Sequence, residues 1–313
     1  MREETHALQH SMLIKQKGII WAVLAAVISG FAVFINKFGV SSWQDAIQYT
    51  TVKNFVAMLV LSTVLLTIAQ WRALKKMTQK QWLKLGVIGV IGGSVPFILF
   101  FKSLPLMPAT QAAFIHKTLF VWVAVMAVIW LKERVGLAQW GGMAVLMIGV
   151  VMLGGPKDWI WGIGFLLALI ATVLWALETV IAKTVLQDIP AIVGAWARMA
   201  FGSVILIVYV LAQGNASGLI PQSSAQVGWA LITGLILFGY VICWYTALKK
   251  LPITLVSTVL VFAFPITVVL DKAWTHTLSG RIVLPLAVMA IGGLFFCIQN
   301  MAFLVTHLQR RGM

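Results

Sequence analysis

Long apolar segments separated by short polar connections occupy almost the whole chain. Ten such segments can be counted, each close to the roughly 20 residues that a helix needs to cross the hydrocarbon core of a bilayer. They lie at residues 18–37, 46–69, 84–102, 107–131, 136–154, 160–182, 189–213, 228–248, 251–271 and 282–305. Because the connections are too short to form a folded extramembrane domain, we expect an all-α integral membrane protein. Its functional site should lie inside the helix bundle.

Composition excludes a soluble globular protein. Of the 313 residues, 61% are hydrophobic and 10% are charged, whereas soluble domains have about 45–50% apolar and about 25% charged residues. Cys243 and Cys297 both fall in apolar segments. We expect them to be reduced packing residues, because a disulfide framework or a metal site would need cysteines at other spacings and further ligand residues.

The net charge of +15 is distributed unevenly between the two sides of the predicted bundle. When the connections are assigned to alternate sides, 15 of the 23 lysines and arginines fall on one side and five on the other. The five are Lys37, Lys102, Lys157, Lys272 and Arg281. Because basic residues concentrate on the cytoplasmic side of membrane proteins, this bias places both termini in the cytoplasm. It also makes a nucleic-acid partner unnecessary as an explanation of the charge.

The two halves of the chain repeat each other. The segment FFKSL at 100–104, followed by Pro108, aligns with WYTAL at 244–248, followed by Pro252, at a constant offset of 144 residues. A repeat of about half the chain indicates a duplicated bundle, and an odd number of spans in the first copy inverts the second in the membrane. We therefore predict ten transmembrane helices as a 5+5 inverted-topology repeat, with the fifth and tenth helices outside.

These boundaries divide the chain into four parts. We expect a cytoplasmic tail at 1–17, a first five-helix repeat at 18–155, a second at 156–305 and a cytoplasmic tail at 306–313. The lipid bilayer of the inner (cytoplasmic) membrane is then a constant partner. Association of two copies as a homodimer is an alternative that the sequence leaves open.

Two blocks resemble a known family. LKERVGLAQWGGMAVLMIGVVML at 131–153 and TALKKLPITLVSTV at 246–259 resemble the conserved blocks of EamA-type transporters of the drug/metabolite transporter superfamily, and the resemblance covers about 18–305. It implies a transporter and names no substrate. Two positions depart from the family pattern: Val121 replaces a proline that Pro265 keeps in the second half, and Thr277 replaces the acid that Glu133 supplies in the first.

Motifs for enzyme chemistry are missing from the sequence. There is no GxxxxGK[ST] loop for nucleotide phosphates and no HExxH metal motif. The five histidines, His6, His10, His116, His276 and His307, are scattered along the chain. We therefore expect no catalytic residues, no cofactor and no metal.

The third segment combines small residues with a proline. Gly86, Gly89, Gly92 and Gly93 precede Pro96. Small residues at these spacings allow the backbones of two helices to approach closely. The proline frees a backbone carbonyl that must find another donor. Tight packing alone or a flexible helix lining the transport path would both fit this pattern.

One acid and one base are predicted to meet inside the second half. Glu178 and Arg198 lie at similar depth on segments that should be neighbouring and antiparallel. They could form a structural ion pair, or Glu178 could take up a proton during transport. Burial favours the neutral carboxyl and the adjacent cation favours the carboxylate, so both alternatives stay open.

Three ionisable residues lie inside the apolar segments of the first half, which contain no acid. These are Lys53, His116 and Lys117. Lys53 could extend its long stem toward the membrane surface, but Lys117 lies about 15 Å from either end of its segment. Because a cation there needs a counter-charge, we predict that an anionic group of the substrate, such as a carboxylate, contacts Lys117, with Lys53 and His116 nearby.

Other polar and aromatic residues are candidates for lining the substrate path, although aromatic residues in spans also serve in packing or at the membrane interface. They are Tyr49, Gln111, Tyr240, Trp244 and Tyr245.

The function predicted from these features is secondary transport of a small organic metabolite, amino-acid-like or otherwise carboxylate-bearing, by alternating access. Protons or an exchanged solute would drive it. The alternatives are a non-transporting membrane sensor or assembly subunit and an exporter of cationic or neutral drugs. A channel fits less well, because no ring of like polar residues is evident.

Overall fold

The computed structural model describes the backbone of residues 2–156 and 159–311 and the side chains of residues 13–108, 110–156 and 159–299. Lys157, which we assign to the external side, lies outside the described residues, as do the side chains of Arg2, Arg310, Arg311 and of the tail histidines. All regular elements in the described part of the chain are helices. The predicted all-α class is confirmed.

The helices follow one another in a simple order. The first half contains α1 (Arg2–Ser41), α2 (Ala46–Thr67), α3 (Trp71–Leu74), α4 (Gln79–Gly93), α5 (Val95–Ser103), α6 (Ala109–Lys117), α7 (Leu119–Trp130) and α8 (Leu137–Gly154). The second half contains α9 (Ile163–Val185), α10 (Ala191–Ala212), α11 (Ser224–Lys250), α12 (Ile253–Leu260), α13 (Ala263–Trp274) and α14 (Val283–Arg311). Short 3₁₀ turns occupy Leu104–Leu106, Ala216–Leu219 and Gly280–Ile282.

Ten helical segments of the described chain are long and apolar enough to cross a membrane, and their bounds agree with the sequence prediction to within a few residues at most ends. One difference concerns the predicted tail at 1–17. Helix α1 runs without a break from Arg2 to Ser41, so its backbone is helical through that region.

Three of the ten spans are broken near their middle. The third is divided into α4 and α5 at Ser94, the fourth into α6 and α7 at Thr118, and the ninth into α12 and α13 at Val261 and Phe262. The last two breaks are equivalent, because Thr118 and Phe262 differ by the repeat offset of 144 residues. The repeat detected in the sequence is therefore also a repeat of local backbone geometry.

The break in the fourth span forms without a proline. Val121 stands where a proline was expected, but the hydroxyl of Thr118 donates to the carbonyl oxygen of Ile115 at 2.6 Å and accepts from Nε1 of Trp122 at 3.1 Å. A threonine that bonds back to the preceding turn bends a helix. The hydrogen bonds of the Thr118 hydroxyl thus occur at the break in the fourth span, where the proline is missing.

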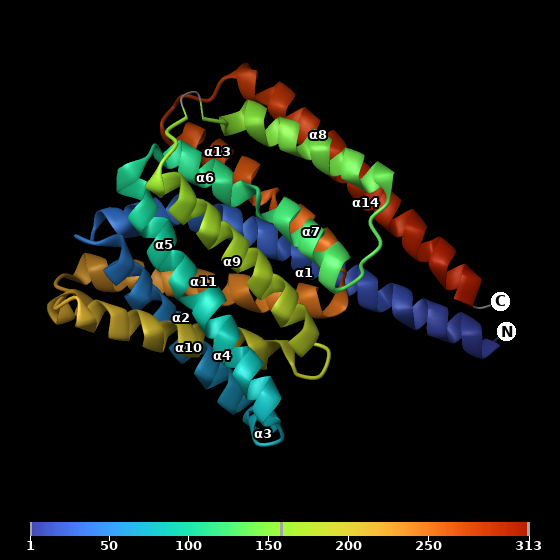
Figure 1. The fold of residues 1–313 in the computed structure, drawn as a ribbon, viewed down its shortest axis with the longest axis horizontal. Coiled ribbons are helices and arrows are strands. Elements are labelled where there is room, and N and C mark those ends of the chain that lie inside the picture. Colours follow the sequence, from blue (N-terminus) through green and yellow to red (C-terminus); the bar gives the residue numbers. More distant parts are fainter. Residues whose placement is uncertain (1, 157–158, 312–313) are drawn as a thin grey trace.

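Helices α8 and α14 pack against each other at the periphery, as predicted for the fifth and tenth spans. Figure 1 shows this pair set off from the other helices, with both chain ends on the same side of the molecule. The contact is close because glycines form it: a Cβ atom at Gly292 would lie 2.5 Å from the backbone nitrogen of Leu146, and one at Gly149 would lie 2.4 Å from Cγ of Met289.

The inner helices interleave the two repeats. Helix α1 packs on α11 and α13, and α10 packs on both α2 and α4, so each contact joins the first half to the second. Helix α9 is covered by α4, α5 and α7 (Figure 1). The residues that could carry function therefore lie where the halves meet.

Candidate functional site

Glu178 on α9 is the one buried acid of the inner helices among the described side chains, with 1% of its surface exposed. Its Oε1 accepts a hydrogen bond from the hydroxyl of Tyr245 on α11 at 2.5 Å. Tyr245 is itself fully buried. The tyrosine fixes the orientation of the carboxyl and satisfies one of its two oxygens.

Arg198 on α10 is the second charge of this site and is 7% exposed. Its Nη2 donates to the carbonyl oxygen of Gly92 on α4 at 3.1 Å, and its Nε has no hydrogen-bond partner among the described residues. Arg198 and Glu178 are near enough to interact electrostatically. No ion pair within 4 Å joins them in the part of the chain that the structure describes.

The arrangement of these two residues differs from the sequence prediction in one respect. Glu178 and Arg198 were expected on directly neighbouring helices, but α4 packs against both α9 and α10. Gly92 is the contact point, since a Cβ atom there would lie 2.3 Å from Cγ of Glu178 and 3.3 Å from Nε of Arg198. The glycines of the third span thus allow α4 to enter between the two charged side chains.

Lys117 and His116 form the last turn of α6, at the break in the fourth span. Nζ of Lys117 lies 5.6 Å from the ring centroid of Phe264, and the side chain is partly exposed. It has no hydrogen-bond or ion-pair partner among the described residues. Lys117 is thus a lysine in the middle of a membrane span without a counter-charge among the described side chains.

His116, which precedes Lys117 in the chain, packs against two aromatic rings. Its ring centroid is 4.9 Å from that of Trp175 and 5.7 Å from that of Phe100, both in edge-on geometry. Trp175 on α9 also donates from Nε1 to the carbonyl oxygen of Gly92 at 3.1 Å. His116 and Arg198 are therefore connected through Trp175 and one backbone carbonyl.

Lys53 does not extend toward solvent. It is 8% exposed, and its Nζ donates to Oδ1 of Asn36 on α1 at 3.2 Å. Tyr49 donates to the same oxygen at 2.7 Å, and Nζ of Lys53 lies 5.2 Å from the Tyr49 ring. Lys53, Tyr49 and Asn36 form a separate cluster between α1 and α2. No hydrogen bond, ion pair or ring contact of the described residues joins this cluster to Lys117.

Gln111 is engaged by the backbone. Its Nε2 donates to the carbonyl oxygen of Ile160 at 2.9 Å, and its Oε1 accepts from the N–H of Ile160 at 3.0 Å. The side chain is fully buried. Both ends of the amide are used to hold the connection that leads into α9, so the geometry gives Gln111 a structural role.

The three aromatic candidates on α11 take different positions. Tyr240 is partly exposed and stacks on Trp244, with ring centroids 6.2 Å apart. Trp244 is 2% exposed and packs in the core, and Tyr245 binds Glu178. Of these three side chains, only Tyr240 presents a ring surface to a solute.

Sequence reasoning missed two residues that complete these clusters. Trp175 donates to the carbonyl oxygen of Gly92 and contacts the ring of His116. Asn36 accepts hydrogen bonds from Tyr49 and Lys53. Asn36 could have been found as a polar residue within an apolar segment. Trp175 gives no such signal, since a tryptophan in a membrane span is ordinary.

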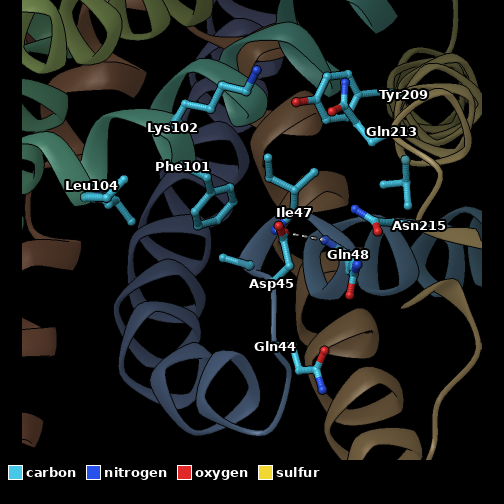
Figure 2. Close-up of a pocket in the computed structure, with 13 residues that line it drawn as sticks. Gln44, Asp45, Ile47, Gln48, Phe101, Lys102, Leu104, Tyr209, Gln213 and Asn215 are labelled. Atoms are coloured by element: carbon cyan, nitrogen blue, oxygen red, sulfur yellow. Dashed lines mark hydrogen bonds between the residues drawn. The ribbon is translucent and has the colours of Figure 1, made fainter. Parts of the chain in front are cut away.

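A hollow of about 480 Å³ opens at one end of the bundle, between the α1–α2 connection, the end of α5 and the end of α10. Figure 2 shows Lys102 and Tyr209 on one side of it and Asp45 and Gln48 on another. Nζ of Lys102 lies 5.3 Å from the Tyr209 ring. The Asp45 carboxylate is occupied in capping α2.

No group of histidine, cysteine or acidic side chains in the described residues could hold a metal ion. The candidate site therefore consists of a partly exposed cation and aromatic rings near the break in the fourth span. A buried carboxyl–tyrosine–arginine group lies next to it.

Comparison with known proteins places this geometry in a family. The profile of the EamA-like transporter family matches residues 16–155 and 162–299, once for each repeat. A crystal structure with 15% sequence identity superposes with a TM-score of 0.74, covering 92% of this chain and 99% of that one. At this identity the superposition shows the fold alone.

Curated relatives agree with the profile. An uncharacterized transporter in the cobO 3' region of a Sinorhizobium species is 26% identical over 140 residues, which are 45% of this chain and 98% of that protein. LicB of Haemophilus influenzae is 23% identical over 247 residues, 75% of this chain and 81% of that protein. A probable 4-amino-4-deoxy-L-arabinose-phosphoundecaprenol flippase subunit ArnE of Hamiltonella defensa is 31% identical over 84 residues, 27% of this chain and 73% of that protein.

The resemblance inferred from the two sequence blocks is thereby confirmed. The two profile matches together cover most of the 313 residues, and the ten candidate spans agree with the fold of such transporters. The chain is a multi-pass membrane protein that belongs to the EamA-like transporter family of the drug/metabolite transporter superfamily.

Proposed function

We propose that this transporter moves a small organic metabolite with a carboxylate or a similar anionic group across the cytoplasmic membrane by alternating access. Family membership supports transport. The basic bias of 15 residues against five supports an orientation with both termini in the cytoplasm.

The observation that carries the substrate class is the state of Lys117. Its ammonium group lies at the break between α6 and α7, partly exposed and without an acid or hydrogen-bond acceptor among the described residues. An unpaired charge away from bulk water is strongly unfavourable. An anionic group on the solute would supply the missing partner at the depth where inverted-repeat transporters bind their substrates.

The surroundings of Lys117 suit the organic part of such a solute. The ring of Phe264 lies below the ammonium group, and the preceding residue, His116, packs against Trp175. Aromatic surfaces bind apolar or planar bodies, while a single cation fixes the orientation of the charged end. The site thus combines one charged anchor, Lys117, with an apolar surface of aromatic rings.

Energy for accumulation would come from a proton on Glu178 or from exchange with a second solute. Glu178 is buried and bound by a tyrosine, and Arg198 is held elsewhere by the backbone. A carboxyl in this setting can lose its proton without needing a new partner. The proton would bind to the carboxylate from one side of the membrane and leave to the other.

The flippase-subunit relative favours a second candidate, in which the anion is a phosphate on a lipid-linked solute. Lys117 would then contact phosphate in place of carboxylate. A lipid-flipping assay in liposomes with a phosphorylated polyprenyl lipid distinguishes this candidate, because a carboxylate transporter would leave that lipid in its original leaflet.

The experiment begins with thermal unfolding of the purified protein against amino acids, hydroxy acids and dicarboxylates, with matched amides and amines. A compound that stabilises the protein is then titrated against Lys117→Met. A charge-assisted contact makes the expected loss of affinity roughly 10- to 150-fold. Lys117→Arg should keep most of the affinity, and Lys102→Met, which removes an exposed lysine, is the matched control.

Two results would contradict the proposal. One is equal affinity of Lys117→Met and the wild type for the stabilising compound. The other is stabilisation by the amines and none by the acids, which would favour the exporter of cationic or neutral drugs. In that case Lys117 would be a lysine kept neutral by burial.

A further inference from the structure

The carbonyl oxygen of Gly92 receives two side-chain hydrogen bonds. Nε1 of Trp175 and Nη2 of Arg198 each lie 3.1 Å from it. In a regular α-helix this oxygen would accept the N–H of the residue four positions later. That residue is Pro96, which has no N–H to give. Because α4 ends at Gly93 and residue 96 has no N–H to bridge the break, the carbonyl is free for the two side chains.

The local chain brings this carbonyl to the charged residues. Ser94 leaves the helical conformation with φ −140° and ψ −72°, and its hydroxyl bonds back to the carbonyl oxygens of Gly89 and Val90 at 3.0 Å. A Cβ atom at Gly93 would lie 2.3 Å from the backbone oxygen of Arg198. The backbone of α4 is in direct contact with α10 here, so the carbonyl of Gly92 can reach the guanidinium.

The second repeat serves as a comparison within the same molecule. Tyr240 occupies the position equivalent to Pro96 at the offset of 144 residues. Helix α11 continues unbroken through it from Ser224 to Lys250. The free carbonyl is thus a property of one half only, the half that faces Glu178 and Arg198.

We propose that the Gly92 carbonyl is the resting partner of Arg198, and that Pro96 is the positioning residue that makes it available. This proposal rests on the proposed uptake of a proton by Glu178. When the carboxyl of Glu178 gains a proton and loses its charge, the guanidinium keeps a hydrogen bond to the backbone. The neutral state of Glu178 is then reached without leaving a buried cation stranded.

The same carbonyl links this event to the proposed anion site. Trp175 bonds to the carbonyl and contacts the ring of His116, which precedes Lys117. A solute that displaces Trp175 would leave Arg198 as the single donor to the Gly92 oxygen. The proposed anion site and the proposed proton site are therefore linked through one acceptor atom, the carbonyl oxygen of Gly92.

The test is Pro96→Ala, which gives residue 96 an N–H that can bond to the Gly92 carbonyl and compete with Arg198. Pro285→Ala is the matched control. Pro285 also lies in the first turn of a helix, α14, but the residue four positions before it, Arg281, belongs to a 3₁₀ turn and not to an α-helix. The first measurement is a double-mutant cycle on thermal unfolding with Glu178→Gln. The cycle isolates the coupling between the two positions.

We expect Pro96→Ala to lower the unfolding temperature of the Glu178→Gln protein by about 3 °C more than it lowers that of the wild type. The reason is that Arg198 depends on the carbonyl once the carboxylate is gone. Additive effects in the cycle would overturn the proposal whether or not protons drive transport. Pro285→Ala should show no coupling with Glu178→Gln.

The second measurement separates this proposal from the proposed function. The infrared carboxyl band that Glu178→Gln removes is titrated with pH in the purified protein. If Arg198 turns to Glu178 in Pro96→Ala, the midpoint of that titration should fall by about one pH unit. A band that titrates in the wild type with an unchanged midpoint in Pro96→Ala overturns the positioning role alone. A band that never titrates overturns proton uptake as well.

Discussion

Glu133 and Thr254 are joined by two hydrogen bonds across 121 residues of sequence. The N–H of Thr254 lies 3.2 Å and its hydroxyl 2.8 Å from Oε2 of Glu133, while Oε1 accepts from the N–H of Ile253 at 2.8 Å. The acid between α7 and α8 of the first repeat thus caps the first turn of α12 in the second. A carboxylate at a helix N-terminus satisfies free N–H groups and opposes the positive end of the helix dipole.

Glu133→Ala should lower the free energy of unfolding by about 2–3 kcal/mol, because it leaves two backbone donors and a hydroxyl without their acceptor. Thermal or denaturant unfolding in detergent measures the effect. The control is Thr277→Ala, at the equivalent exposed position of the second repeat, which should change stability by less than about 0.5 kcal/mol. Equal effects of the two substitutions would show that the cap contributes nothing specific.

Gly92→Ala should be strongly destabilising. The added Cβ would lie 2.3 Å from Cγ of Glu178, a distance at which the helix or the side chain must move. Overpacking of this kind costs about 1–3 kcal/mol. Gly86→Ala in the same helix is the matched control, since no atom lies within 4 Å of its Cβ position. We expect that control to be neutral or to stabilise α4 by up to about 1 kcal/mol.

Glu178→Gln should abolish accumulation driven by a proton gradient and leave solute exchange in part, if Glu178 carries the proton. The fold should lose only about 1–3 kcal/mol, because Arg198 keeps its hydrogen bond to Gly92. If the two residues were instead a structural ion pair, adding Arg198→Gln should restore part of that stability. Flux in liposomes with and without a pH gradient measures the first effect, and an active, fully accumulating Glu178→Gln protein would contradict it.

The orientation can be tested by cysteine labelling in intact cells, after replacement of Cys243 and Cys297. Leu106→Cys and Ser217→Cys should react with an impermeant maleimide from outside, and Lys76→Cys should react only after permeabilisation. Leu106, Ser217 and Lys76 are all exposed. Ser103, the last residue of α5, is fully buried and therefore unsuitable. The reverse labelling pattern would refute both the cytoplasmic termini and the sidedness of the basic bias.

Much of the fold follows from the sequence because hydrophobic length alone specifies membrane spans. The ten spans, the repeat and the outer pair could all be predicted in this way. The break at Thr118 could not, since the expected proline was missing and the bend involves a threonine hydroxyl. The helix propensities of the residues do not reveal such a bend, because it also depends on how the neighbouring helices pack.

The site was predicted in composition more than in geometry. Glu178 and Arg198 were expected to lie close together, but α4 enters between them because glycines remove the side chains that would keep it away. The freed carbonyl of the third span was predicted, whereas its donors were not. Trp175 and Arg198 lie 83 and 106 residues from Gly92 in sequence, and periodicity does not say which helices become neighbours.

The close glycine contact between α8 and α14 has a consequence for how the protein is made. The helix that fits α8 is made only after α9 to α13, because α14 begins at Val283. While those five helices are inserted, the glycine face of α8 has no partner helix. The first repeat is therefore not a finished folding unit when its synthesis ends. The outer pair can form only once α14 has been made.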